Sequence, residues 1–301
     1  MRIMIAGGTG FVGRRLIDHF RNPENMIFVL TRHPEKYKDE PYVKYIEWLT
    51  PDSQPEIPIQ QVDVCINLAG ESLNSGRWTE ERKRSILESR MTTTREFIRI
   101  MDTLKTKPEV YINASAIGYY GTSTEKIFTE NTIVAGRDFL AEVCDVWEAE
   151  AQAAEALGIR TVLTRFGLIL DRNNGVLPLF ALPYQMMVGG KVGSGEQWMS
   201  WIHIQDVVLA IEWIIQNKAV SGPVNFTAPK PKRNKDFGKE LAETLNRPTW
   251  LSIPSTPVRV ALGDMSDLIL KGQYVLPRKL QDSGYSFKYR SLDRALDNIY
   301  R

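Results

Sequence analysis

The sequence predicts an α/β protein in which a doubly wound parallel sheet is joined to a smaller C-terminal lobe. The first observation is a short apolar run at the N-terminus that leads directly into a glycine-rich turn. The second is that apolar runs alternate with amphipathic stretches up to about residue 166. The third is that this alternation weakens after about residue 170, where Pro, Gly, Met and aromatic residues are mixed. Continuous apolar strands between helices favour a parallel sheet that is covered on both faces.

The strands expected in the first half are short apolar runs bounded by polar or small residues. They are 2–6, 26–31, 43–48, 62–69, 108–116 and 159–166. Between them, apolar residues recur at helical spacing, which predicts helices. These helices are 11–21, 79–104, which could be one helix or two, and 138–158. Strands and helices that alternate in this order are typical of a Rossmann-type sheet.

The second half is expected to form the substrate side of the molecule. Residues 176–204 lack a clean period and contain Pro and Gly, so they are expected to form loops over a cleft. A strand is expected at 222–228, and helices at 204–217 and 236–246. Beyond Pro254, Gly and Pro residues separate stretches that favour short helices.

These patterns predict two domains. The first is a Rossmann domain at 1–245, in which the substrate-side segments begin at about residue 171. The second is a small α-rich C-terminal domain at 246–301. A chain of 301 residues is long enough for one large α/β domain and a smaller annex.

Composition and charge narrow the expected partners and location. The chain is 43% hydrophobic and 25% charged, with a net charge of +2, so neither nucleic acid nor an acidic surface is indicated. No apolar run approaches the ~18–20 residues of a membrane span, so no membrane partner is expected. Cys65 and Cys144 have no metal-ligand spacing, and we expect no metal, a reducing compartment and hence the cytoplasm.

The N-terminal glycines predict a dinucleotide site. They lie directly after a strand and directly before a helix, where a tight turn lets the backbone approach a pyrophosphate. The start of the helix then supplies free N–H groups and a partial positive charge. The predicted cofactor contacts are Gly7, Thr9, Gly10, Phe11, Val12 and Gly13. The alternative is a glycine turn that serves packing alone.

Two further strand ends refine the cofactor prediction. An acidic residue after the second strand would bind the ribose of NAD, but this chain has Thr31 and Arg32 there. The guanidinium of Arg32 could pair with a 2′-phosphate, which favours NADP(H) over NAD(H), although Arg32 could also be a solvated loop residue. Leu68, Ala69 and Gly70 end the fourth strand, where the cofactor crosses such a sheet.

Several motifs together resemble a known superfamily. They are "MIAGGTGFVG", "DVCINLAGE", "YINASAIGYYG", "LTRFGLIL" and "SWIHIQDVV". In this order they resemble the landmarks of the extended short-chain dehydrogenases/reductases, which include NAD-dependent sugar-nucleotide epimerases. More narrowly, the chain is similar to an atypical branch labelled "epimerase family protein", which carries a C-terminal domain of unknown function. The stretches that match it are "GRWTEERKRSILESR", "GSGEQWMSWIHIQD" and "LGDMSDLILKGQYVLPRKLQDSGYSFKY".

The resemblance implies an NADP(H)-binding Rossmann domain and a substrate-side lobe, but no settled reaction. It also implies a catalytic Tyr and, four residues later, a Lys on helix 138–158, where the Lys lowers the pKa of the Tyr and holds the ribose. This chain has Val143 and Trp147 at those positions, and neither can replace the pair. Trp147 is interpreted as a packing residue, or else as a flat wall or hydrogen-bond donor near the cofactor.

Other residues are therefore candidates for the chemistry. The resemblance places Ser115 at the strand end where a Ser orients substrate or cofactor, although Ala116 could hold that position and Ser115 could satisfy backbone groups. Tyr119 and Tyr120 follow in the next loop. His203 titrates near neutrality, although such a histidine can instead fix a loop or cap a helix. Candidate substrate contacts are Glu71, Arg165 and Trp201, and Arg165 could equally tie loops together.

Two functions remain open at this point. One is an NADP-dependent oxidoreductase or epimerase-like enzyme with a non-standard acid–base group, acting on a small molecule such as a nucleotide sugar or carbonyl compound. The other is a non-catalytic NADP(H)-binding sensor or interaction protein that has lost the Tyr–Lys pair. Relatives in the superfamily often dimerise through helices such as 79–104 and 138–157, so a homodimer is also considered.

Overall fold

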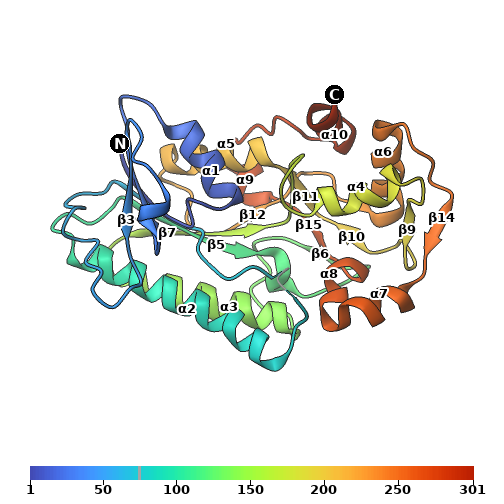
Figure 1. Ribbon diagram of the computed structural model, residues 1–301, viewed down its shortest axis with the longest axis horizontal. Coiled ribbons are helices and arrows are strands. Elements are labelled where there is room, and N and C mark those ends of the chain that lie inside the picture. The colour runs from blue at the N-terminus through green and yellow to red at the C-terminus, as the bar shows by residue number, and fades with distance from the viewer. Residues whose placement is uncertain (74–75) are drawn as a thin grey trace.

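The computed structural model describes residues 1–73 and 76–301. A seven-stranded sheet runs through its centre in the order β12-β7-β5-β4-β1-β2-β3, and every neighbouring pair is parallel (Figure 1). The strands are β1 (Arg2–Ala6), β2 (Met26–Thr31), β3 (Val43–Glu47), β4 (Val64–Asn67), β5 (Val110–Ala116), β7 (Arg160–Phe166) and β12 (Gly222–Phe226). This sheet confirms the predicted doubly wound, Rossmann-type fold.

Helices cover both faces of the sheet. Figure 1 shows α2 (Glu80–Thr103) and α3 (Phe139–Gln152) on one side and α1 (Phe11–Phe20) and α5 (Ile204–Gln216) on the other. Alternate residues of β1 enter the two cores, because successive side chains of a strand point to opposite faces. Ile3 and Ile5 pack in the core that includes α1 and α5, whereas Met4 and Ala6 pack in the core that includes α2.

The predicted long helix is a single helix. Thr79 caps it, because its hydroxyl accepts a hydrogen bond of 3.2 Å from the backbone N–H of Arg82. The C-terminal end of α3 continues into the 3-10 turn η3 (Ala153–Leu157). This helical segment ends at Gly158, which has a positive φ of 76°. Three other 3-10 turns are η1 (Pro34–Lys36), η2 (Ile117–Tyr120) and η4 (Gly263–Ser266).

Residues 176–204 differ from the expected loops. They form α4 (Leu177–Gln185), β9 (Gly190–Val192), β10 (Trp198–Met199) and β11 (Trp201–His203). Each of these strands pairs with a segment that is distant in the sequence: β14 (Leu251–Ile253), β13 (Lys232–Arg233) and β8 (Leu168–Leu170), respectively. Strands of two or three residues carry no readable period, so only the remote partners define them.

The C-terminal segments cross the molecule and join it at several places. The short strand β15 (Tyr274–Val275) pairs in parallel with β6 (Ile127–Phe128). Phe287 packs in the core beside α1 and α5, and Asp206 on α5 accepts hydrogen bonds from the backbone N–H groups of Lys288 and Tyr289. The remaining helices are α6 (Asn234–Leu245), α7 (Ser255–Leu262), α8 (Asp267–Leu270), α9 (Arg278–Asp282) and α10 (Leu292–Tyr300).

Among the described residues, no helix combines the length and the apolar character that crossing a membrane requires.

Candidate active site

The glycine loop joins β1 to α1 in a conformation that side chains would obstruct. Gly7 has a φ of +73°, and a Cβ there would lie 2.7 Å from the carbonyl carbon of Leu68. A Cβ on Gly13 would lie 2.4 Å from the carbonyl oxygen of Gly7, so the helix start packs directly on the loop. Gly10 forms the N-cap of α1 without a side-chain cap, and the first turn contains no acidic residue. The free N–H groups of this turn are therefore suited to an anion.

Two other predicted cofactor segments lie at the same edge of the sheet. Thr31 ends β2 and Leu68 follows β4, and these strands are the two neighbours of β1. The side chain of Arg32 is exposed and makes no hydrogen bond or ion pair with any residue in 1–73 or 76–301. The carboxyl ends of three adjacent strands thus surround the glycine loop, as dinucleotide binding requires.

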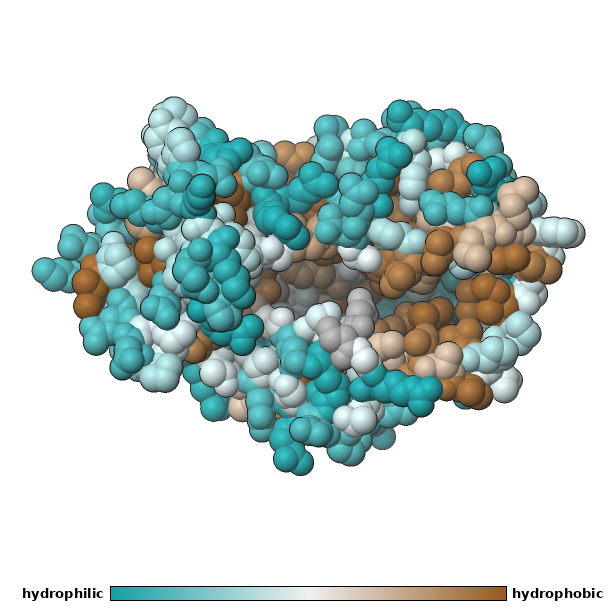
Figure 2. Space-filling view, in the orientation of Figure 1, coloured by the Kyte–Doolittle hydropathy of each residue, from teal (hydrophilic) through white to brown (hydrophobic). Residues whose placement is uncertain are grey.

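A cavity of about 200 Å³ opens at the carboxyl ends of β5 and β7. Ala116 and Phe166 contribute from these two strands, and Val143 and Trp147 contribute from α3. The cavity is also lined by residues of 197–200, 267–269 and 271–273. Figure 2 shows that the molecule is hollowed near the centre of the face in view, with apolar residues gathered on the right side of the hollow.

Trp147 has both a packing role and a place in the wall of the cavity. Its indole N–H donates a hydrogen bond of 3.1 Å to the hydroxyl of Thr94, so its donor is already occupied. Its ring lies 4.9 Å from the guanidinium carbon of Arg90. Trp147 is 6% exposed, and Val143 beside it is 3% exposed.

Ser115 and Arg165 converge on a buried carboxylate that sequence analysis missed. Ser115 donates a hydrogen bond of 2.6 Å to Glu148, and Arg165 donates two hydrogen bonds of 2.7 Å to the same carboxylate. Arg165 also donates to the hydroxyl of Tyr120 at 2.9 Å. A signal for Glu148 was present, because it follows Cys144 by four residues on the apolar face of its helix.

The hydroxyls of the two predicted tyrosines are hydrogen-bonded to other residues of the protein. The hydroxyl of Tyr119 donates to the backbone carbonyl of Ile133 at 2.7 Å, and that of Tyr120 donates to the side-chain oxygen of Asn225 at 2.8 Å. Burial raises the pKa of Tyr120 to about 12, which makes it a poorer base near neutral pH. The catalytic roles of Tyr119 and Tyr120 stay predictions, and in this arrangement neither lines the cavity.

Neither His203 nor Trp201 lines the cavity. His203 borders a separate cleft of about 550 Å³, which is also lined by Arg15 and Ile299. Its Nδ1 accepts a hydrogen bond of 3.0 Å from the backbone N–H of Gln205 and so caps α5. Trp201 has no exposed surface, and its indole N–H donates to the carbonyl of Lys230 at 3.2 Å. In this arrangement His203 caps a helix and Trp201 is packed in the core, and the catalytic role of His203 and the substrate role of Trp201 stay predictions.

His203 also predicts a pH dependence of stability. Burial lowers its pKa from about 6.5 to about 4, so below pH 6.5 the unfolded chain binds the proton before the folded chain does. The contribution of neutral His203 to the free energy of unfolding is fully present above pH 6.5. It is lost as the pH falls toward 4, and the total loss is about 3 kcal/mol. His203→Asn keeps a capping side chain but removes the titration. Urea unfolding measures this effect. Between pH 7 and pH 5, the free energy of unfolding should fall less for His203→Asn than for the wild type. An equal fall in both proteins would contradict the prediction.

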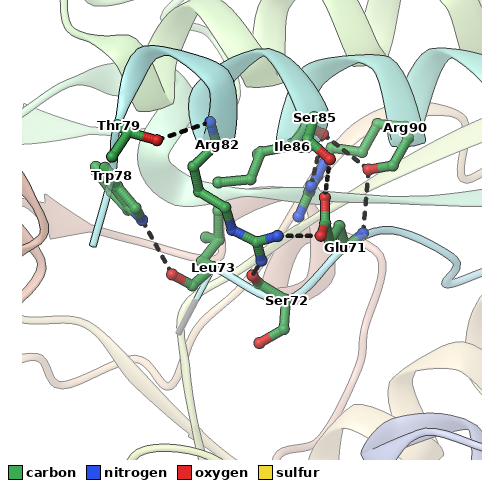
Figure 3. A network of polar contacts seen from close by, with 10 residues as sticks. Glu71, Ser72, Leu73, Trp78, Thr79, Arg82, Ser85, Ile86 and Arg90 are labelled. Carbon is green, nitrogen blue, oxygen red and sulfur yellow. Dashed lines mark hydrogen bonds and ion pairs between the residues drawn. The ribbon is translucent and has the colours of Figure 1, made fainter. Parts of the chain in front are cut away.

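Glu71 anchors the segment that follows β4. Figure 3 shows its carboxylate between Arg82 and Ser85 of α2, and both side chains donate hydrogen bonds to it. The hydrogen bond from Ser85 is the main cause that lowers the pKa of Glu71, and Arg82 adds to it. The indole N–H of Trp78 donates to the carbonyl of Leu73 at 3.0 Å and holds the same segment. Glu71 therefore positions the chain at one edge of the cavity.

The fold and the glycine loop define a Rossmann-type NAD(P)-binding protein. Comparison with known proteins specifies this class, because residues 3–226 match the NAD dependent epimerase/dehydratase family. The chain belongs to that family. Residues 253–299 match a domain of unknown function, DUF1731. The predicted resemblance to the "epimerase family protein" branch is confirmed by these two matches and by the relatives below.

Three similar proteins cover the whole chain or nearly so. Epimerase family protein YfhF of Bacillus subtilis (strain 168) is 44% identical over 99% of this chain and 98% of its own length. A crystal structure of the human epimerase family protein SDR39U1 (isoform2) with NADPH has a TM-score of 0.88 at 28% identity, covering 100% of this chain and 99% of that one. The nucleoside-diphosphate sugar epimerase of Corynebacterium glutamicum has a TM-score of 0.80 at 29% identity, and this chain spans 58% of it.

Proposed function

We propose that the protein is an NADP(H)-dependent enzyme of the oxidoreductase or epimerase type that acts on a small molecule. The observation that carries this proposal is that the glycine loop and the cavity open at the same edge of the parallel sheet, where ligands of such sheets bind. The cofactor would lie with its pyrophosphate at the start of α1 and its nicotinamide against Ala116 and Phe166. A carbonyl compound or a nucleotide sugar is the proposed class of substrate.

The acid–base group of this enzyme is not the usual Tyr–Lys pair. Of the described residues that line the cavity, none is a Tyr, His or Glu. Lys271 and Asp267 line it and form an ion pair of 2.8 Å, with side chains that are 46% and 40% exposed. These two groups, or water that enters with the substrate, are our candidates for carrying the proton.

NADP(H) is the proposed cofactor because a positively charged residue, Arg32, directly follows β2. Arg32 has no protein partner among the described residues, so its guanidinium is free to bind a 2′-phosphate in a bidentate manner. The human relative was crystallised with NADPH, which supports the same choice.

Arg32→Ala is expected to weaken NADPH binding by about tenfold or more, because a hydrogen bond to a charged group contributes about 1.5–3 kcal/mol. NADH, which lacks the 2′-phosphate, should bind the variant and the wild type equally. The measurement is a fluorescence titration with each nucleotide. Lys38→Ala, which removes another exposed positive charge six residues further along the chain, is the control. An unchanged ratio of NADPH to NADH affinity in Arg32→Ala would show that the 2′-phosphate assignment is wrong.

A second candidate function is NADP(H) binding without turnover. It is favoured by the buried network, in which the hydroxyls of Ser115 and Tyr120 and the guanidinium of Arg165 already bind protein groups. Val143 and Trp147 likewise supply no proton to the cavity. Such a protein would report the redox state of the nicotinamide pool or present a surface to a partner.

One experiment separates the two candidates. Purified protein is titrated with NADPH, and the complex is then mixed with a panel of carbonyl compounds and nucleotide sugars while the absorbance of the reduced nicotinamide is followed. Oxidation by a member of the panel supports the enzyme. Binding without oxidation across the whole panel supports the sensor, and failure to bind NADPH contradicts both.

A further inference from the structure

Arg90 is a buried cation without a buried anion to match it. Its side chain lies on α2 and is 8% exposed. One of its donors reaches the backbone carbonyl of Ile86 at 2.9 Å (Figure 3), and no carboxylate in residues 1–73 or 76–301 forms an ion pair with it. Arg165, by contrast, is neutralised by two hydrogen bonds to Glu148. A buried guanidinium without a partner is costly, so its presence here needs an explanation.

Glu71 and Cys144, the acidic groups that act electrostatically on Arg90, are already engaged or neutral. The carboxylate of Glu71 binds Arg82 and Ser85. Burial raises the pKa of the Cys144 thiol to about 12, so this thiol is uncharged near neutral pH. Asp138, which lines the same cavity, accepts a hydrogen bond from the backbone N–H of Ala141 and caps α3. The remaining donors of Arg90 thus have no acceptor among the described residues.

Arg90 stands where a cofactor would pass. It lines the cavity at the carboxyl ends of β5 and β7. On one side it contacts the segment that follows β4, because a Cβ on Gly70 would lie only 3.3 Å from the Cζ of Arg90. Its guanidinium also lies on the ring of Trp147, the residue that the resemblance places where the superfamily has its lysine.

We propose that Arg90 donates hydrogen bonds to the ribose oxygens on the nicotinamide side of NADP(H), and so supplies from α2 the positive charge that a lysine on α3 would supply. The inference rests on the proposed function, because it places NADP(H) in this cleft. Trp147 then serves as the platform for the guanidinium, which it holds by a cation–π contact. The hydrogen bond from its indole to Thr94 keeps that platform in place.

The test compares two probes that differ in the nicotinamide half. NADPH carries the ribose in question, whereas adenosine 2′,5′-bisphosphate carries only the adenosine and the 2′-phosphate. Arg90→Met, which keeps the length and apolar stem of the side chain, is expected to bind NADPH about ten- to a hundredfold more weakly. It should bind adenosine 2′,5′-bisphosphate as the wild type does. Arg84→Met removes an exposed arginine from the same helix and should change neither affinity.

The unfolding of the cofactor-free protein separates this role from a structural one. Removing an unpaired buried charge should leave the urea midpoint of Arg90→Met unchanged or raise it. A lower midpoint, unchanged NADPH affinity, or equal weakening of both probes would overturn the proposal. If the wild type binds both probes and Arg90→Met binds each of them with the same affinity as the wild type, only this inference fails. If the wild type binds neither probe, the proposed function fails as well.

Discussion

Glu148→Gln is expected to lower the free energy of unfolding by about 3–5 kcal/mol, the usual effect of breaking a buried ion pair from one side. The carboxylate is 5% exposed and accepts two hydrogen bonds from Arg165 and one from Ser115. An amide can accept from only one side and carries no charge. Arg165, which is 2% exposed, would therefore keep a buried positive charge without its counter-ion.

Urea unfolding of the cofactor-free protein measures this effect. Glu150→Gln is the matched control, because Glu150 lies on the same helix but pairs with Arg95, whose side chain is 61% exposed. That change should cost no more than about 1 kcal/mol. The double variant Glu148→Gln/Arg165→Met should recover part of the stability, since it removes the orphaned charge. A loss for Glu148→Gln as small as that of the control would show that the buried pair does not stabilise the fold.

Gly13→Ala is expected to weaken NADPH binding by about five- to a hundredfold, because overpacking of this kind costs about 1–3 kcal/mol. The added Cβ would lie 2.4 Å from the carbonyl oxygen of Gly7 and 2.5 Å from the Cα of Gly8. Neither is the end of a flexible side chain, so the loop must move away from the start of α1. The free N–H groups at the start of the helix and the backbone of the loop can then no longer bind the same anion together.

A fluorescence titration with NADPH tests this prediction, with a thermal melt of the cofactor-free protein to show that the variant is folded. Gly10→Ala provides a graded comparison. Its Cβ would lie 3.2 Å from the same oxygen, and its φ of −81° suits any residue. The loss of affinity should therefore be smaller than for Gly13→Ala. Equal affinities of Gly13→Ala and wild type would contradict a close approach of loop, helix and pyrophosphate.

The sheet and its helices could be predicted because their signals are local. A strand such as 2–6 is a continuous apolar run, and the glycines that follow it stand at the order and spacing of a dinucleotide loop. The predicted strand 159–166 corresponds to β7, and the predicted helix 79–104 corresponds to α2. Each of these patterns lies within one stretch of chain, so no knowledge of distant partners is needed.

The hydrogen-bond partners of the predicted site residues could not be predicted from such local patterns. Ser115 and Glu148 are 33 residues apart, and Tyr120 and Asn225 are 105 residues apart. Nothing in the sequence around Tyr120 indicates that its hydroxyl donates a hydrogen bond to Asn225. The sequence around His203 likewise does not tell which side of the sheet the imidazole faces.

By itself, the sequence determined the class of fold, the place of the glycine loop and the absence of Tyr and Lys from positions 143 and 147. The tertiary structure decided which side chains are already engaged and which face the cavity. It paired Arg165 with Glu148, and it placed Arg90, from another helix, on the ring of Trp147. The physical reason is that periodicity reports burial along one element, whereas charge neutralisation depends on elements that meet only after the chain has folded.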